Sequence, residues 1–277
     1  MNQPLVYIIV LTWNGKSDTL ECLESLQKID HQNFKILVVD NASIDGTADS
    51  VRMCFPSIEL IVNKENLRFA GGNNVGIHYA LQHGAEYIVL LNNDTTVDIG
   101  FLKNLIGAVA TDEHIGMAGP KIYYFNDPQR LWFAGGRIVW WKGAVFHIGI
   151  REIDHGQYDT QVETDYITGC CLLVRRSVIQ SVGMLDERYY IYGEDADWCV
   201  RASRAGFKLV YVPSSKIWHK LSVSSGGHLS WFKNWNKLKS NVRLMARYAK
   251  PYQWLTISFA MALNIVASFV KIILKHK

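Results

Sequence analysis

Polar side chains that could bind a ligand gather in four short segments, and each segment directly follows an apolar run. The four are Thr12-Trp13-Asn14, Asp40 to Ser43, Asn63 to Gly76 and Asn92-Asn93-Asp94. The first is not the G-x-G-x-x-G turn of a dinucleotide site, and the chain has neither G-x-x-x-x-G-K-[ST] nor G-x-S-x-G. The sequence therefore disfavours NAD enzymes, P-loop NTPases and α/β-hydrolases.

The elements that must position these segments alternate between strands and helices. Four short apolar runs without polar alternation are typical of strands buried on both faces, at 5–11, 34–39, 58–62 and 87–91. Helices are predicted between them at 18–28, 46–54 and 74–83. This order predicts an α/β protein with a parallel sheet and right-handed crossovers. Ligands of such sheets bind beyond the carboxyl ends of the strands, so the four polar segments are expected to converge on one edge.

The composition indicates a folded globular protein without a cysteine framework. The chain has 277 residues, of which 49% are hydrophobic and 19% charged. Its 5 cysteines are odd in number and form no C-x-x-C pair, which argues against both disulfide staples and a zinc cluster. The cysteines therefore favour a reducing compartment. No positive charge precedes the first apolar run, so we expect no signal peptide.

Charge is distributed unevenly along the chain. No Asp or Glu follows Asp197, whereas residues 198–277 carry a purely basic set of Lys and Arg side chains. A wholly basic segment indicates an anionic partner, either a phosphate-bearing membrane surface or nucleic acid. The alternative is a basic face with no partner.

The stretch from Tyr252 to Val270 contains no charge and favours the membrane over nucleic acid. A polar stripe, Asn264, Ser268, Lys271 and Lys275, follows one face of the predicted helix. This pattern predicts a helix that lies in the membrane interface. A short span, and packing against the protein's own core or a partner subunit, are the alternatives.

Six motifs in this order resemble family 2 glycosyltransferases, and most closely their rhamnosyltransferase-like branch. The resemblance runs from about Leu5 to His219, and beyond the four polar segments it includes T-G-C-C-L-L-V-R-R from Thr168 and G-E-D-A-D-W-C from Gly193. It implies a GT-A fold, a nucleotide-sugar donor, an inverting mechanism, and Mg²⁺ or Mn²⁺ as cofactor. We expect a GT-A domain at 1–222, with a nucleotide-sugar-binding half at 1–95 and an acceptor half at 96–222. Residues 223–277 would form basic and apolar helices that associate with the membrane.

The resemblance also implies roles on the donor side. Asp40 would accept the N3–H of a uracil or thymine ring, with a local turn as the alternative role. Arg68 stands where the family usually has glycine, so it either offers its guanidinium group to the diphosphate or lies on the surface. The other residues expected to contact the nucleotide sugar are Thr12, Asn14, Asn66, Asn73 and Asn93.

A divalent cation would neutralise the departing diphosphate. The resemblance assigns Asp94 as a metal ligand, in a motif with amides where acids often stand, so that metal would bind only together with the donor. A turn cap is the alternative for Asp94. His219 would ligate metal or meet phosphate, or else be a structural histidine.

The acceptor side needs a base that takes the proton of the attacking hydroxyl. The resemblance assigns this role to Asp195, and the start of a helix there would favour its ionised form. Glu194 would orient the site, Asp197 would contact the acceptor, and Gly169 would lie in a strand beneath it. A nucleophile at Cys170-Cys171 is rejected, because no histidine and amide partner accompanies it. Trp132 would fill the core or stack on a sugar.

Together these observations predict an inverting hexosyltransferase on the cytoplasmic face of a membrane, peripheral or monotopic. It would move a deoxysugar such as rhamnose from a dTDP donor onto a cell-surface glycan or lipid-linked acceptor. A UDP-sugar donor, or a non-catalytic glycan-binding role in an assembly complex, is the alternative. We expect an anionic membrane surface and no nucleic acid as partner. A homodimer through the apolar tail stays open.

Overall fold

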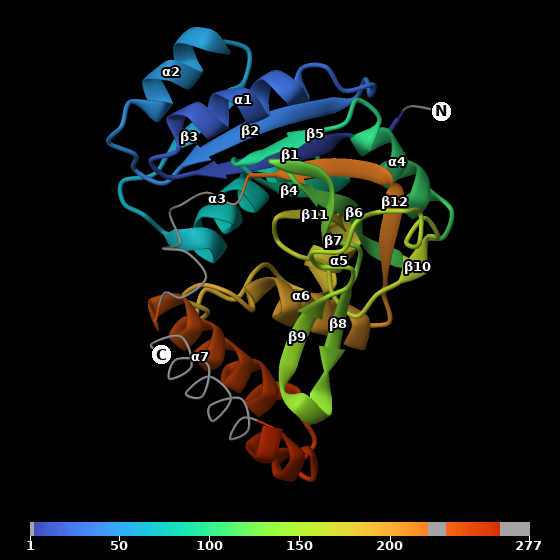
Figure 1. The fold of residues 1–277 in the computed structure, drawn as a ribbon. Helices are drawn as coiled ribbons and strands as arrows, with labels where there is room; N and C mark the ends of the chain where they lie inside the picture. The colour runs from blue at the N-terminus through green and yellow to red at the C-terminus, as the bar shows by residue number, and fades with distance from the viewer. Residues whose placement is uncertain (1–2, 221–230, 261–277) are drawn as a thin grey trace, which may run out of the picture.

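A mixed sheet of ten strands forms the centre of the molecule (Figure 1). The computed structural model describes residues 3–220 and 231–260. Eight strands follow the order β10-β12-β6-β11-β4-β1-β2-β3, while β5 pairs with β12 and β7 pairs with β6. The predicted parallel arrangement is confirmed for β1, β2, β3 and β4. Beyond β4 the sheet changes direction, because β11 runs antiparallel to both of its neighbours.

The N-terminal half follows the predicted alternation of strands and helices. Its elements are β1 (Val6–Thr12), α1 (Lys16–Leu26), β2 (Phe34–Asp40), α2 (Thr47–Cys54), β3 (Glu59–Val62), α3 (Arg68–Gln82), β4 (Tyr87–Asn92) and β5 (Thr95–Val97). Helices α1 and α2 cover one face of the sheet and α3 covers the other (Figure 1). The strands read as continuous apolar runs because both faces are buried.

The second half extends the sheet and adds a hairpin. Its elements are α4 (Phe101–Ala110), β6 (Ile115–Tyr124), β7 (Asp127–Phe133), β8 (Gly136–Val139), a 3-10 turn (Trp140–Lys142), β9 (Ala144–His147), β10 (Val162–Glu163), β11 (Cys171–Arg175), α5 (Arg176–Val182), α6 (Glu194–Arg204), β12 (Lys208–His219) and α7 (Trp231–Tyr248). The strand predicted from residue 168 was wrong at its start. Residues 168–170 precede β11 in a turn, so Gly169 lies in a turn and not in a strand.

Helix α3 begins six residues earlier than predicted. Gly71 and Gly72 precede the helix predicted from residue 74, but they lie in its first turns, and Gly76 follows in the same helix. A Cβ atom at Gly72 would lie 2.5 Å from Leu11 Cδ1, and one at Gly76 would lie 2.7 Å from Ile9 Cγ2. The glycines are therefore needed for close packing of the helix on β1, and this packing outweighs their low helix propensity.

The basic helix α7 packs against the rest of the protein. Its Leu244 and Met245 are buried, and a Cβ atom at Gly143, at the tip of the β8–β9 hairpin, would lie 3.4 Å from Met245. A further helical segment begins at Gln253. No helix within residues 3–220 and 231–260 is both long and apolar enough to cross a membrane. The polar stripe predicted from Asn264 to Lys275 lies outside the described residues.

Candidate active site

The first and fourth polar segments meet through a buried cluster of hydroxyls and an amide. The Oγ1 atoms of Thr12 and Thr19 lie 2.8 Å apart. The Asn93 side-chain amide donates to Thr19 Oγ1 at 3.0 Å and to Thr12 Oγ1 at 3.3 Å. Strands β1 and β4 are hydrogen-bonded neighbours, so their ends necessarily bring Thr12 and Asn93 together. Both predicted donor-side residues thus lie at the expected edge, in contact with each other.

The first and second segments are joined by Asn14. Its backbone N–H donates to Ser43 Oγ, and its side-chain oxygen accepts the N–H of Ile44, both at 2.8 Å. Asp40 is fully buried, and its carboxylate accepts both the backbone N–H and the hydroxyl of Ser43. In this structure Asp40 therefore makes the contacts of the local-turn alternative, and its contact with a base stays a prediction.

Asn41 links the second segment to the third, a role that the sequence analysis missed. Its amide donates to Asn66 Oδ1 at 3.3 Å and to the carbonyl of Arg68 at 3.0 Å, and its oxygen accepts from Asn63. The only sequence signal for this role of Asn41 is its position directly after Asp40, at the end of a buried strand. Asn66 in turn accepts the N–H of Arg68, which fixes the start of α3.

Arg68 takes the backbone conformation that favours glycine. Its φ is +62°, in the left-handed region that costs an L-residue about 1–2 kcal/mol. The guanidinium carbon lies 3.7 Å from the centre of the Tyr190 ring, so a stacking contact accompanies the strained backbone. Asn73 is buried and its amide donates to the carbonyl of Phe69 within α3, and its contact with the nucleotide sugar stays a prediction.

Strand pairing brings Asp94 and His219 together. Asp94 lies in the turn between β4 and β5, and the register of β5 with β12 places Thr95 opposite His219. As a result His219 Nε2 lies 3.1 Å from Asp94 Oδ1, and both side chains are less than one tenth exposed. These two predicted metal ligands, far apart in the sequence, are thus neighbours.

The pair fits a divalent cation that other ligands help to bind. Two ligands at about 2.1 Å from an octahedral cation, at right angles, lie roughly 3 Å apart. The separation of 3.1 Å agrees with this value. Among residues 3–220 and 231–260 there is no group of three or more His, Cys, Asp or Glu side chains that could hold a metal. Two protein ligands leave most positions of the cation for diphosphate oxygens and water.

Aromatic rings from the β7 and β9 strands line the His219 side of the site. The Trp132 ring packs edge-on against two imidazoles, with its centre 4.6 Å from that of His219 and 4.5 Å from that of His147. Burial lowers the pKa of His147 to about 4, so this imidazole is neutral at pH 7 and offers no positive charge to an anionic ligand. Trp132, expected either in the core or beside a sugar, is half-buried against His219.

Asp195, in the first turn of α6, contacts the turn at Gly169. Its Oδ2 atom accepts the N–H of Gly169 at 2.8 Å, and Oδ1 accepts the N–H of Ala196 at 2.8 Å. The next residue of the turn, Cys170, is buried, and burial followed by the charges of Asp94 and Asp195 raises the pKa of its thiol. The Cys170 carbonyl accepts the N–H of Asn92 at 2.9 Å, so the same turn contacts both the candidate base and the strand end that precedes the candidate metal ligand Asp94. The raised pKa of the thiol agrees with rejecting it as a nucleophile.

Burial, not the helix terminus, dominates the ionisation of the acidic pair. Desolvation raises the pKa of Asp195, although the N–H bonds of Gly169 and Ala196 lower it in part. Burial and the charge of Asp195 raise the pKa of Glu194 to about 8. We expected the start of the helix to favour the ionised form of Asp195. This expectation was wrong, because desolvation raises the pKa of Asp195 by more than the backbone N–H groups lower it. A carboxylate with a raised pKa is a stronger proton acceptor once it is ionised.

Asp197 holds α7 in place. It is fully buried, and it accepts hydrogen bonds from Arg201 Nε at 2.8 Å, Arg247 Nη1 at 2.9 Å and the Tyr248 hydroxyl at 2.8 Å. These partners differ from the expected acceptor contact and give Asp197 a structural role. Its position in the Glu-Asp-x-Asp run carried no signal of this role, since the partners on α7 lie 50 and 51 residues away.

Comparison with known proteins places this site in a family context. The chain is 25% identical over 241 residues to N-acetylglucosaminyl-diphospho-decaprenol L-rhamnosyltransferase of Mycobacterium tuberculosis, covering 79% of this chain and 77% of that protein. It is 26% identical over 253 residues to rhamnosyltransferase WbbL of Escherichia coli K12, covering 88% and 93%.

Solved structures confirm the predicted GT-A fold. GalNAc-T7, solved with UDP, GalNAc and Mn²⁺, aligns with a TM-score of 0.71 at 16% identity over 91% of this chain and 49% of that one. Mannosyltransferase PcManGT of Pyrobaculum calidifontis, solved with GDP-Man and Mn²⁺, aligns with a TM-score of 0.64 at 19% identity over 94% and 70%. The model described as Glycosyl transferase family 2 matches residues 7–183, more than half of the chain. The protein therefore belongs to glycosyl transferase family 2.

Proposed function

We propose that this glycosyltransferase transfers a deoxysugar such as rhamnose, with inversion, from a dTDP donor to a hydroxyl of a lipid-linked or cell-surface glycan precursor. One observation carries the proposal. The turn at Gly169-Cys170 contacts Asp195 through the N–H of Gly169 and the end of β4 through the Cys170 carbonyl, and the paired Asp94 and His219 lie just beyond that strand end, where the polar loops converge. The rhamnosyltransferase names of the relatives support the choice of sugar.

The chain's own residues divide the chemistry between two sides of this turn. Asp195, whose Oδ atoms each accept one backbone N–H, is oriented to take the proton of the attacking acceptor hydroxyl. Asp94 and His219 would hold Mg²⁺ or Mn²⁺, which neutralises the charge of the leaving diphosphate. The base and the leaving group then lie on opposite sides of the sugar, as inversion requires. The neutral carboxyl of Glu194 beside Asp195 avoids a second negative charge there.

The donor would lie along the ends of β1 and β2. Thr12, Asn14 and Asn93 already tie these loops together, and Asp40 lies between them at the base of its turn. Arg68, stacked on Tyr190, places a positive charge at the start of α3. Asp40 and the loop residues would bind a thymine or uracil base, and Arg68 would bind the diphosphate that follows it.

The C-terminal segment would hold the enzyme at the cytoplasmic face of a membrane. Arg243 and Lys250 are exposed basic residues, and Leu255 and Phe259 are exposed at 80% and 68%. Exposed apolar side chains beside basic ones are typical of a peripheral attachment to anionic lipid. Binding to anionic vesicles that fails to exceed binding to DNA would contradict this part of the proposal.

Turnover of dTDP-rhamnose tests the function. Purified protein is incubated with labelled dTDP-rhamnose, Mn²⁺ and membrane lipids of the source organism, and the label in the lipid fraction is counted. Asp195→Asn is expected to reduce transfer by at least about 100-fold, because general base catalysis contributes factors of this size. Binding of dTDP should stay unchanged. Asp49→Asn, at an exposed carboxylate on α2, is the matched control. Wild-type turnover by Asp195→Asn would contradict the assignment of the base.

A further inference from the structure

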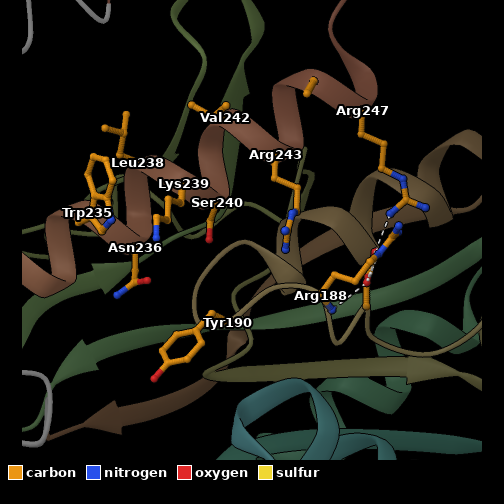
Figure 2. A pocket seen from close by; sticks show the side chains of 12 residues that line it. Arg188, Tyr190, Trp235, Asn236, Leu238, Lys239, Ser240, Val242, Arg243 and Arg247 are labelled. Carbon is orange, nitrogen blue, oxygen red and sulfur yellow. Dashed lines mark hydrogen bonds and ion pairs between the residues drawn. The ribbon is translucent and has the colours of Figure 1, made fainter.

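A groove lies between α7 and the loop at residues 183–193, outside the residues described above as the active site. Its volume is about 1170 Å³. Figure 2 shows Lys239, Ser240 and Arg243 pointing from α7 toward the loop that carries Arg188 and Tyr190. This volume exceeds the roughly 300–1,000 Å³ of small-molecule sites, so the groove has room for more than a single phosphate.

The groove carries an excess of positive charge. Four of its lining residues are cations, Arg188, Lys239, Arg243 and Arg247, and one is an acid, Asp186. Arg188 binds this acid through Nε and Nη2, and Arg247 binds it through Nη1. A guanidinium group has five N–H donors, so both arginines keep donors for a ligand.

Lys239 and Arg243 are the cations most available to a ligand. Both are exposed, and the structure gives them only ring contacts, with Lys239 5.2 Å from Trp235 and Arg243 5.5 Å from Tyr189. Neither forms a salt bridge within residues 3–220 and 231–260. Residues 221–230 and 261–277, which lie outside the described part of the chain, contain no Asp or Glu that could neutralise them. Their arrangement is complementary to an anion such as a diphosphate.

The groove adjoins both halves of the active site. Ser240 Oγ donates to the carbonyl of Ile191 at 3.1 Å, and a Cβ atom at Gly193 would lie 3.2 Å from Ser240 Cβ. Gly193 directly precedes Glu194 and the candidate base Asp195. Tyr190, which lines the groove, stacks on Arg68 of the donor side. A molecule in this groove therefore reaches the acceptor side of the site.

We propose that this groove binds the diphosphate of a lipid-linked acceptor, with Arg243 and Lys239 as its main phosphate contacts. The inference rests on the proposed function and names its acceptor class. Trp235 and Val242, which also line the groove, are 43% and 38% exposed and offer apolar surface to the first isoprene units. This arrangement keeps the sugar of the acceptor near Asp195 while its carrier extends along α7 toward the membrane.

Calorimetric titration of the full-length protein with farnesyl diphosphate tests the proposal. The donor site is first filled with dTDP and excess Mg²⁺, and physiological salt screens weak surface attraction. Arg243→Gln and Lys239→Gln are each expected to weaken binding by about tenfold, and the double variant by about 100-fold, because each removes one charge-assisted contact. Lys142→Gln, which removes the same charge from an exposed lysine that contacts the Trp141 ring outside the groove, is the matched control and should bind within about twofold of the wild type.

Comparison ligands separate the lipid-linked diphosphate from other anions. Farnesol and inorganic pyrophosphate should each bind at least about tenfold more weakly than farnesyl diphosphate, since each lacks one part of the ligand. Wild-type affinity in Arg243→Gln, an equal loss in Lys142→Gln, or equal binding of inorganic pyrophosphate would overturn the proposal. The dTDP titration reports separately on the donor site, so failure of the groove and failure of the proposed function give different results.

Discussion

Replacement of Asp197 with alanine is expected to loosen α7 from the rest of the protein. Asp197 is the buried carboxylate that Arg201, Arg247 and Tyr248 share, and two of these partners belong to α7. Without it, the guanidinium group of Arg201, whose side chain is only 15% exposed, loses its negative partner. A buried charge without its partner is strongly destabilising.

The size of the effect follows from the burial of each partner. Removal of one member of a buried ion pair costs about 3–5 kcal/mol. Arg201 keeps bonds to two backbone carbonyls, and Arg247 keeps its bond to Asp186, so we expect the lower end, about 3 kcal/mol, for Asp197→Ala. Arg247 is 38% exposed, and screening by solvent reduces its attraction to Asp197 to about 1–2 kcal/mol.

A double-mutant cycle in urea measures these values. Unfolding is followed for the wild type, Asp197→Ala, Arg247→Ala and the double variant, and the coupling should be about 1–2 kcal/mol. Limited proteolysis should cleave Asp197→Ala near α7 at a protease concentration that leaves the wild type intact. An unfolding midpoint of Asp197→Ala equal to that of the wild type would refute the anchoring role. So would losses of unfolding free energy in the two single variants that add up to the loss in the double variant.

Further predictions concern the acidic pair and two glycines. Because the pKa of Glu194 is raised from 4.5 to about 8, the folded state holds a proton that the unfolded state releases between these values. The free energy of unfolding should therefore fall as pH rises through this window, by at most about 1.4 kcal/mol per unit, and Glu194→Gln should flatten the slope in urea titrations. Equal slopes would contradict this. Gly76→Ala should destabilise the protein by about 1–3 kcal/mol, because its Cβ would clash with Ile9. Gly107→Ala, in open space on α4, should stabilise it by about 0.5–1 kcal/mol in the same assay.

Local sequence patterns were sufficient for the parallel half of the fold. Each buried strand reads as an apolar run, and the polar residues after it, such as Thr12 and Asn93, lie at the predicted edge. The start of α3 could not be predicted in this way. Three glycines within six residues suggest a loop, and only the packing of Gly72 and Gly76 on β1 explains the helix.

Long-range pairing determines what the sequence could not show. The contact between Asp94 and His219 depends on the register of β5 with β12, across 125 residues, which no local pattern specifies. The role of Asp197 depends in the same way on where α7 packs. The raised pKa of Asp195 depends on desolvation of its carboxyl group in the folded protein, which the sequence near a helix start does not indicate.

Nucleotide binding tests the central claim most directly. Folded wild-type protein is titrated by calorimetry with dTDP, UDP and GDP, each with and without Mn²⁺, and the series is repeated with Asp94→Asn. The account predicts metal-dependent binding of dTDP in preference to GDP. It also predicts that Asp94→Asn weakens this binding by at least about tenfold, through loss of a metal ligand. Folded protein that binds none of the three nucleotides, or binds dTDP equally well without metal and without Asp94, would contradict it.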